Sequence, residues 1–245
     1  MRIFFVLVAV SFAVISCSKK TEEFNTATVT DYFPLEVGRT LTYRLDSTIP
    51  APFGTSLIKR YYLAKDSIEH KFTDNQNRAS YRIFRYLRDT LQTKPWTYNS
   101  TFYATIGTDG KSIEYNDNNL RFLKLRAPIT NGFSFKGNSQ INTASGGQFY
   151  YLDDWNYTYE STGEPYTVRR GTFDTTVTVN QVNLMDPEVF DPSRYNSKTF
   201  SKEVYAKGVG LIYREMLYYI YQTTPPPAYY TDDSFGVTMN LVDYK

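Results

Sequence analysis

The chain has 245 residues, and its 27 basic and 25 acidic residues nearly cancel. Such a balance creates no strong field for nucleic acid, and no basic run alternates with stacking aromatics, so we expect no nucleic-acid partner. Aromatic residues make up 17% of the chain, with 23 tyrosines and 17 phenylalanines. Because Tyr, Phe and Thr suit half-buried pleated surfaces, this composition predicts an all-β fold with few helices.

Residues 1–16 have the pattern of a secretory signal peptide. Arg2 supplies a positive charge, residues 3–14 form an uncharged and mostly apolar run, and Ser16 is the small residue at the cleavage position. The apolar run is shorter than the roughly 20 residues that a membrane-spanning helix needs. Polar residues follow at once, so we expect a cleaved signal peptide and no transmembrane helix.

Cys17 is the only cysteine and therefore has no partner for an internal disulfide. With the preceding Val14-Ile15-Ser16 it resembles the lipobox of bacterial lipoproteins. The resemblance implies cleavage before Cys17 and attachment of a thioether-linked diacylglycerol, with acyl chains such as palmitate holding the protein on a membrane. Two acyl chains suffice for stable anchoring. An ordinary signal peptide with an incidental cysteine is the alternative.

Residues 17–30 are polar and predict a lipidated, flexible tether, followed by a single β domain over residues 31–245. Alternating apolar and polar residues predict an antiparallel meander that forms a strongly curved sheet, a half-barrel or a sandwich. Asp109-Gly110 lies between two alternating runs and predicts a hairpin turn. The apolar residues that share one parity next to this turn are Trp96, Tyr98, Phe102, Ala104 and Ile106. Further expected strands are 41–46, 56–65, 81–88, 111–115, 120–125, 173–184, 203–221 and 235–241.

Two stretches, 34–41 and 128–135, both fit the pattern Pro-[Leu/Ile]-x-x-Gly-x-[Ser/Thr]-[Leu/Phe]. One hypothesis is that the domain consists of two duplicated halves, about 31–127 and 128–245. The alternative is that Pro-x-x-x-Gly is a common way to begin a strand.

The stretch 31–43, which begins Asp31-Tyr32-Phe33-Pro34-Leu35, and the stretch 204–215, which contains Gly208-Val209-Gly210, resemble a group of lipoproteins of the Bacteroidota. Phe235-Gly236-Val237 fits the same group. The group has no assigned activity, so the resemblance implies an exported lipoprotein and no mechanism. Ser18 follows the lipidated cysteine in place of the Asp that retains enteric lipoproteins at the inner membrane, which predicts the outer membrane, on its periplasmic face or the cell surface.

Catalytic and metal-binding patterns are sparse. The one histidine, His70, is not accompanied by a Gly-x-Ser-x-Gly motif, and one histidine with one acylated cysteine cannot make an ordinary zinc site. The acidic pairs do not match the spacing of a calcium loop. We therefore predict no catalytic residue, no metal and no cofactor.

The candidate ligand surface comprises Asp153, Asp154, Trp155, Tyr157 and Tyr159, because aromatic rings beside carboxylates suit sugars. Three functions remain open. The first is a non-catalytic binding or accessory module for an outer-membrane protein or a glycan. The second is a carrier of lipid or another apolar ligand in a β-cavity. The third is a glycan-acting enzyme that uses carboxylates near Trp155.

Four triplets resemble the short O-glycosylation sequence of Bacteroidota, Asp-[Ser/Thr] followed by a small or apolar residue. The hydroxyl-bearing residues are Ser47, Ser67, Thr90 and Thr175, and all four are expected at or near strand ends. The alternative is turn chemistry, since Asp-Ser and Asp-Thr are also favoured in turns.

Changing Cys17→Ala is expected to abolish lipidation, because no other thiol can form the thioether. The variant should leave the membrane fraction or accumulate as precursor, as judged by fractionation and intact-mass measurement. An unmodified Cys17 in the membrane fraction of the wild type would contradict the lipobox interpretation.

Overall fold

The computed structural model describes residues 27–245, so the predicted signal peptide, Cys17 and most of the tether lie outside the described residues. The described chain folds into one antiparallel sheet of thirteen strands with a four-residue helix and two short 3-10 helices, which confirms the all-β prediction. The elements are α1 Val29–Tyr32, β1 Thr40–Pro50, η1 Pro52–Gly54, β2 Leu57–Thr73, β3 Ala79–Asp89, β4 Thr97–Ile106, β5 Ser112–Asp117, β6 Leu120–Arg126, β7 Ser134–Phe135, η2 Tyr150–Leu152, β8 Tyr157–Val168, β9 Gly171–Asp186, β10 Asn196–Ala206, β11 Gly210–Gln222, β12 Tyr229–Tyr230 and β13 Phe235–Tyr244.

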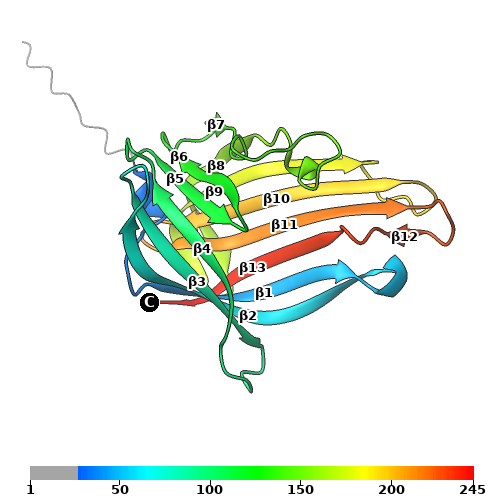
Figure 1. Ribbon diagram of the computed structural model, residues 1–245, viewed down its shortest axis with the longest axis horizontal. Helices are drawn as coiled ribbons and strands as arrows, with labels where there is room; N and C mark the ends of the chain where they lie inside the picture. Colours follow the sequence, from blue (N-terminus) through cyan, green and yellow to red (C-terminus); the bar gives the residue numbers. More distant parts are fainter. Residues whose placement is uncertain (1–26) are drawn as a thin grey trace, which may run out of the picture.

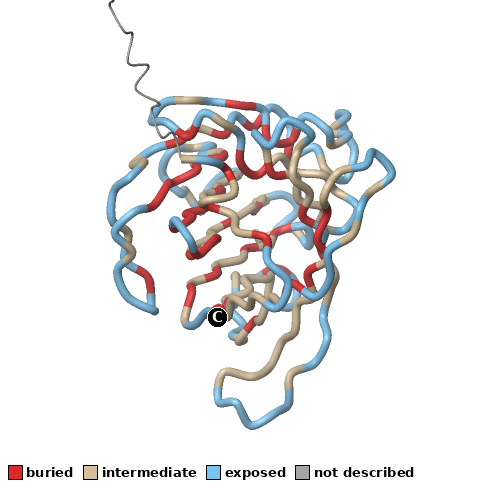
Figure 2. Tube along the Cα trace, turned by 90° about the vertical axis from the view of Figure 1, so that its left-hand side faces the viewer, coloured by how far each residue is buried: buried red, intermediate tan, exposed pale blue. Residues whose placement is uncertain are grey.

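The sheet curls until it is nearly closed into a barrel (Figure 1). Its strand order is β6-β5-β4-β3-β2-β1-β13-β11-β10-β9-β8-β7, and β12 pairs with β11 beside this path. Two meanders, β1–β6 and β7–β13, therefore join where β1 pairs with β13. Figure 2 shows the ring-like outline of the trace, with the turn between β3 and β4 hanging below it.

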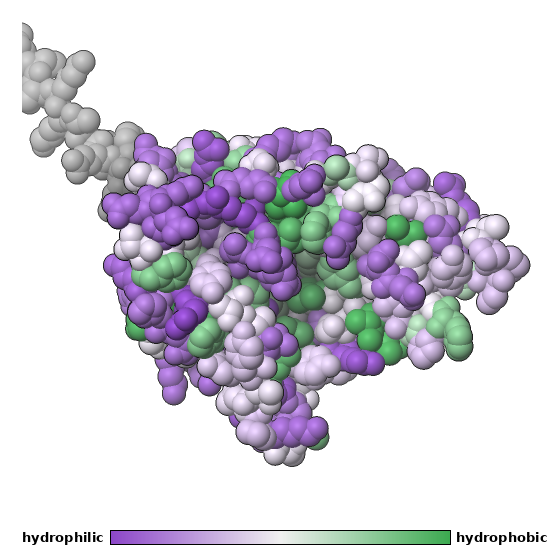
Figure 3. Space-filling view, in the orientation of Figure 1, coloured by the Kyte–Doolittle hydropathy of each residue, from purple (hydrophilic) through white to green (hydrophobic). Residues whose placement is uncertain are grey.

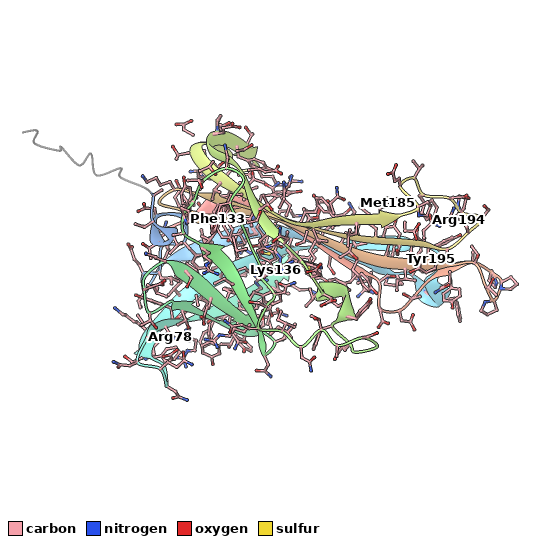
Figure 4. The ribbon with its side chains drawn as sticks, turned by 90° about the horizontal axis from the view of Figure 1, so that it is seen from above. Arg78, Phe133, Lys136, Met185, Arg194 and Tyr195 are labelled. Carbon is pink, nitrogen blue, oxygen red and sulfur yellow. The ribbon has the colours of Figure 1, made fainter. Side chains whose placement is uncertain are left out.

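The two ends of the molecule differ. The segment with α1 lies at one end, and the end of β9 with Met185 and the β9–β10 loop with Arg194 and Tyr195 lie at the other (Figure 4). On the side seen in Figure 3, apolar side chains gather in a central hollow, while polar side chains cover most of the surrounding surface. The concave face of the sheet thus holds the core, as expected for a curved sheet with one solvated face.

The seam between the edge strands β6 and β7 is held by single hydrogen bonds and not by a ladder. The Leu123 amide donates to the Gly137 carbonyl at 2.8 Å. The buried Tyr159 hydroxyl donates to the Arg126 carbonyl at 2.8 Å and accepts from the Arg126 amide at 2.7 Å. A phenol from β8 therefore satisfies backbone groups that the missing ladder would have paired.

The two Pro-x-x-x-Gly stretches have the same local geometry. Gly38 and Gly132 have φ angles of 93° and 80°, which glycine adopts without strain. Each glycine amide donates at 2.8 Å to a carbonyl on the next strand, that of Ile68 or Tyr159. The amide of Ile68 or Tyr159 in turn donates to the carbonyl of the residue that follows the glycine. The stretches lead into β1 and β7, so the predicted halves coincide with the two meanders. The duplication itself stays a prediction.

Changing Tyr159→Phe removes both seam hydrogen bonds while keeping the ring. We expect the free energy of unfolding to fall by about 1–3 kcal/mol, because two backbone groups of Arg126 lose their partner. Denaturant titration measures the loss. The control is Tyr103→Phe, whose ring is exposed, and its stability should change by less than about 0.5 kcal/mol. Equal stability of the two variants would contradict the role of Tyr159 at the seam.

Candidate functional site

The three rings of the predicted ligand surface lie in the core. Trp155 is 3% exposed, and Tyr157 and Tyr159 are more deeply buried still. Each polar tip has an internal partner: the indole of Trp155 donates to the Tyr151 carbonyl, and the Tyr157 hydroxyl donates to Asn138. Because these partners allow burial without loss of a hydrogen bond, the rings pack inside the sheet. The prediction of an exposed stacking surface is wrong for these three residues.

Asp153 and Asp154 line one surface pocket of about 310 Å³ together with Trp155, and each carboxylate has a partner of its own. Asp153 accepts from the Thr143 hydroxyl at 2.5 Å, and Asp154 forms a 2.6 Å ion pair with Lys136, which Figure 4 labels. The hydrogen bond and charge of Lys136 lower the pKa of Asp154, whereas a general acid near neutral pH needs a raised pKa. Glu160 is exposed on β8. The two carboxylates that share the pocket with Trp155 are therefore each held by a different partner, and Glu160 does not line that pocket.

His70 is an exposed residue of β2. Its ring is stacked with the ring of Phe72, and the two ring centres are 6.4 Å apart. Within residues 27–245, no group of three or more His, Cys, Asp or Glu side chains is placed to hold a metal ion. No helix in the same range is long and apolar enough to cross a membrane.

Charged residues occupy the interior of the sheet around Glu203. Its carboxylate accepts from Lys124 at 2.6 Å, from Gln181 at 3.0 Å and from the Tyr205 hydroxyl at 2.7 Å. Arg214 lies 3.6 Å away. Burial alone would raise the pKa of Glu203, but the charges of Lys124 and Arg214 and the hydrogen bonds of Lys124 and Tyr205 together hold it below its ordinary value. Glu203 is thus an ionised group with fixed partners.

Burial, reinforced by the nearby Arg214 charge and opposed by Glu203, lowers the pKa of Lys124. The lowered pKa of Lys124 favours its neutral form, whereas the lowered pKa of Glu203 favours a charged carboxylate beside a charged lysine. We take Glu203 as ionised because two cations and two neutral donors address one carboxylate, and such a set stabilises only its charged form.

The cavity beside this network has a volume of about 60 Å³ and reaches Tyr43, Ile83 and Tyr115. That is room for a few water molecules, whereas sites for small ligands have volumes of roughly 300–1,000 Å³. Among residues 27–245, this cavity is therefore too small to enclose the acyl chain that a lipid carrier would hold.

The outer side of β2, β3 and β4 carries a set of aromatic rings that we call the outer aromatic face. Phe84, Tyr86 and Tyr98 contact one another edge to face, with ring centres 5.8–6.4 Å apart. Tyr98 and Tyr103 are 56% and 41% exposed. The residues of the outer aromatic face are Phe72, Phe84, Tyr86, Trp96, Tyr98 and Tyr103.

A β-bulge brings part of this face together. Arg85 pairs with Ser100, but the next residue, Tyr86, pairs with Tyr98, so Asn99 is an extra residue in β4. Residues on either side of a bulge change faces. Consequently Phe102 points into the core while Tyr98 lies outside, and the predicted single parity of residues 96–106 is wrong. A broken alternation at 98–102 is the only sequence signal of this change.

A groove of about 770 Å³ borders the outer aromatic face at Trp96. Its lining residues come from β1, β2, the end of β3 and the turn that follows it, the turn between β8 and β9, and the end of the chain from β13 onward. Five basic side chains line this basic groove and a single acidic one, Asp243, does so. Its residues are Thr40, Thr42, Arg44, Leu63, Lys65, Arg88, Thr90, Gln92, Trp96, Arg169, Val242, Asp243 and Lys245.

The candidate O-glycosylation residues lie in different settings. Thr90 directly follows β3 and Thr175 is exposed near the start of β9, both near strand ends. Ser47 lies within β1, and Ser67 lies in the middle of β2, paired with both β1 and β3. The expectation that all four are at or near strand ends is therefore wrong for Ser67, and glycosylation itself stays a prediction.

Comparison with known proteins gives a distant likeness in fold. No family model matches the chain, and no curated protein matches it. A predicted exported protein with a YmcC-like fold from Bacteroides fragilis aligns over 87% of this chain and 98% of its own, with 12% identity and a TM-score of 0.43. A predicted lipoprotein from Parabacteroides distasonis covers the same shares with 13% identity and a TM-score of 0.36. Likenesses at this level carry no information about function.

Changing Glu203→Gln should destabilise the fold by about 3–5 kcal/mol at pH 7, because Lys124 and Arg214 lose their counter-charge. Since the folded pKa of Glu203 is lowered, its ionisation contributes stability above the ordinary carboxyl pKa of 4.5, and this contribution is lost as the pH falls through the folded value. As the pH is lowered below 4.5, the free energy of unfolding of the variant should therefore fall less than that of the wild type. Denaturant titrations across pH test this, with the exposed Glu188→Gln as control; parallel pH profiles would contradict it.

Proposed function

We propose that the protein is an outer-membrane lipoprotein, anchored through Cys17, that acts as a non-catalytic binding module for a glycan of the cell envelope. The observation that carries the proposal is the outer aromatic face. Tyr98 and Tyr103 expose much of their rings on a sheet whose inner side is already filled. Large exposed aromatic groups are costly in water and are enriched where a protein binds a partner.

Cationic groups accompany the rings. The Arg82 guanidinium lies 4.9 Å from the centre of Phe84, and Lys65 lies 5.3 Å from that of Tyr86. Flat rings can stack on sugar rings, while the cations and hydroxyls around them can donate to sugar oxygens. Such a surface binds without providing a nucleophile or a general acid, which is what a non-catalytic module requires.

The anchor gives this surface its location. Ser18 and the polar residues after it support outer-membrane sorting, and the lipobox resemblance supports attachment there. Protease treatment of intact cells distinguishes the two remaining positions: digestion indicates the cell surface, and full protection indicates the periplasmic side.

The double change Tyr98→Ala with Tyr103→Ala should weaken binding of the mature lipoprotein to immobilised envelope polysaccharide from its host. The expected loss is about tenfold or more, because aromatic anchors typically contribute more than about 1 kcal/mol each. Tyr150→Ala is the matched control, since Tyr150 is 55% exposed but belongs to η2. Unchanged binding of the double variant would contradict the proposal. Capture of a stoichiometric protein in place of a glycan would favour the accessory function.

A further inference from the structure

The basic groove has a net positive charge, because its five basic side chains outnumber Asp243 in the lining and Asp46 beside Arg44. Arg44 has Asp46 at 2.7 Å. Lys65, Arg88 and Arg169 have no carboxylate within 4.0 Å among residues 27–245, and the same is true of Lys245. Elsewhere in the described sheet the half-buried arginines have acidic partners, as Arg85 has in Asp66, with the exception of Arg82 beside Phe84 on the outer aromatic face. Half-buried arginines without a carboxylate partner, Arg82 and Arg88, therefore lie on the outer aromatic face and in the adjoining groove.

Two of these cations share one indole ring. The Arg88 guanidinium carbon lies 4.2 Å and the Lys65 ammonium 4.9 Å from the centre of Trp96. Arg88 also donates to the Gln92 side chain at 2.8 Å, and its Nε is buried with no acceptor. The side chains are thus held in place by neutral groups while their charges repel each other. An anion placed between them would remove that repulsion.

We propose that the basic groove binds the acidic groups, carboxylate or phosphate, of a saccharide chain whose sugar rings lie on the adjoining outer aromatic face. This inference rests on the proposed function and adds the class of ligand. The guanidinium of Arg88 offers the planar fork that matches carboxylate and phosphate oxygens, and Lys65 adds a point charge. The hydroxyls of Thr40, Thr42 and Thr90 line the same groove and can bond to sugar hydroxyls.

The dimensions and continuity of the two surfaces fit a chain ligand. The groove volume of about 770 Å³ lies within the usual range for ligand sites, roughly 300–1,000 Å³. Lys65 contacts both Trp96 in the groove and Tyr86 on the outer aromatic face, so the two surfaces are continuous. An acidic sugar in the groove would therefore place the next sugar beside Tyr86 and Tyr98.

The test compares a charged saccharide with its uncharged counterpart. Tetragalacturonate and its fully methyl-esterified form share one sugar backbone, and esterification replaces each carboxylate charge by a neutral methyl ester. Calorimetric titration of each into the mature lipoprotein gives both affinities. We expect the acid to bind at least about tenfold more tightly than the ester, with the difference shrinking as salt is raised. Glucose 1-phosphate and inorganic phosphate, titrated separately, show whether a phosphate group is accepted and whether the sugar is needed.

Variants locate the binding. Arg88→Met and Lys65→Met remove a charge but keep an apolar stem, and each should weaken tetragalacturonate binding about tenfold while leaving the ester unaffected. Lys94→Met is the control, because Lys94 is exposed in the same turn but does not line the groove. Thermal unfolding of each variant verifies that it is folded.

Each result bears on a different claim. Equal binding of acid and ester, with loss in the Tyr98→Ala, Tyr103→Ala variant, overturns the acidic-ligand inference and leaves the proposed function standing. An acid preference that Lys94→Met reduces as much as Arg88→Met overturns the assignment to this groove. Failure of all four probes and of the host polysaccharide to bind overturns both proposals.

Discussion

The nearly closed sheet depends on the buried ion pair between the carboxylate of Glu203 and the ammonium group of Lys124. Lys124 belongs to the edge strand β6 of the first meander, and Glu203 belongs to β10 of the second. Their contact crosses the interior, so it joins two parts of the sheet that no ladder joins at the seam. A buried charge is tolerated only while its partners stay in place. The position of β6 is thereby tied to that of β10 and β11.

This constraint decides where the protein can bind something. With Glu203, its partners and the aromatic core filling the concave side, little internal space is left. The interior serves stability, and the outer side of β2, β3 and β4 carries exposed rings and, beside them, cations without a carboxylate partner among residues 27–245. A curved sheet with a rigid core holds such a surface in a fixed shape, which lowers the entropic cost of binding an extended ligand.

The sequence predicted the elements better than their faces. Alternation in 235–241 and the Asp109-Gly110 turn correspond to β13 and the β4–β5 connection, because both signals are local. Tyr157 and Tyr159 were expected outside, since alternation indicates that two faces differ without indicating which one is buried. Glu203 and Lys124 resemble solvated strand residues in the sequence. Their burial depends on each other, across a separation that no local pattern encodes.

The outer aromatic face includes a one-residue bulge in β4, and this has a consequence for how related sequences can diverge. Deleting Asn99 would restore regular pairing with β3 and would leave Tyr98 opposite Tyr86 and Phe102 opposite Ile83. One codon could therefore be lost or regained at this position without moving a ring from one face of the sheet to the other. Length variation within a strand, usually treated as damage to a fold, would here be absorbed by the bulge.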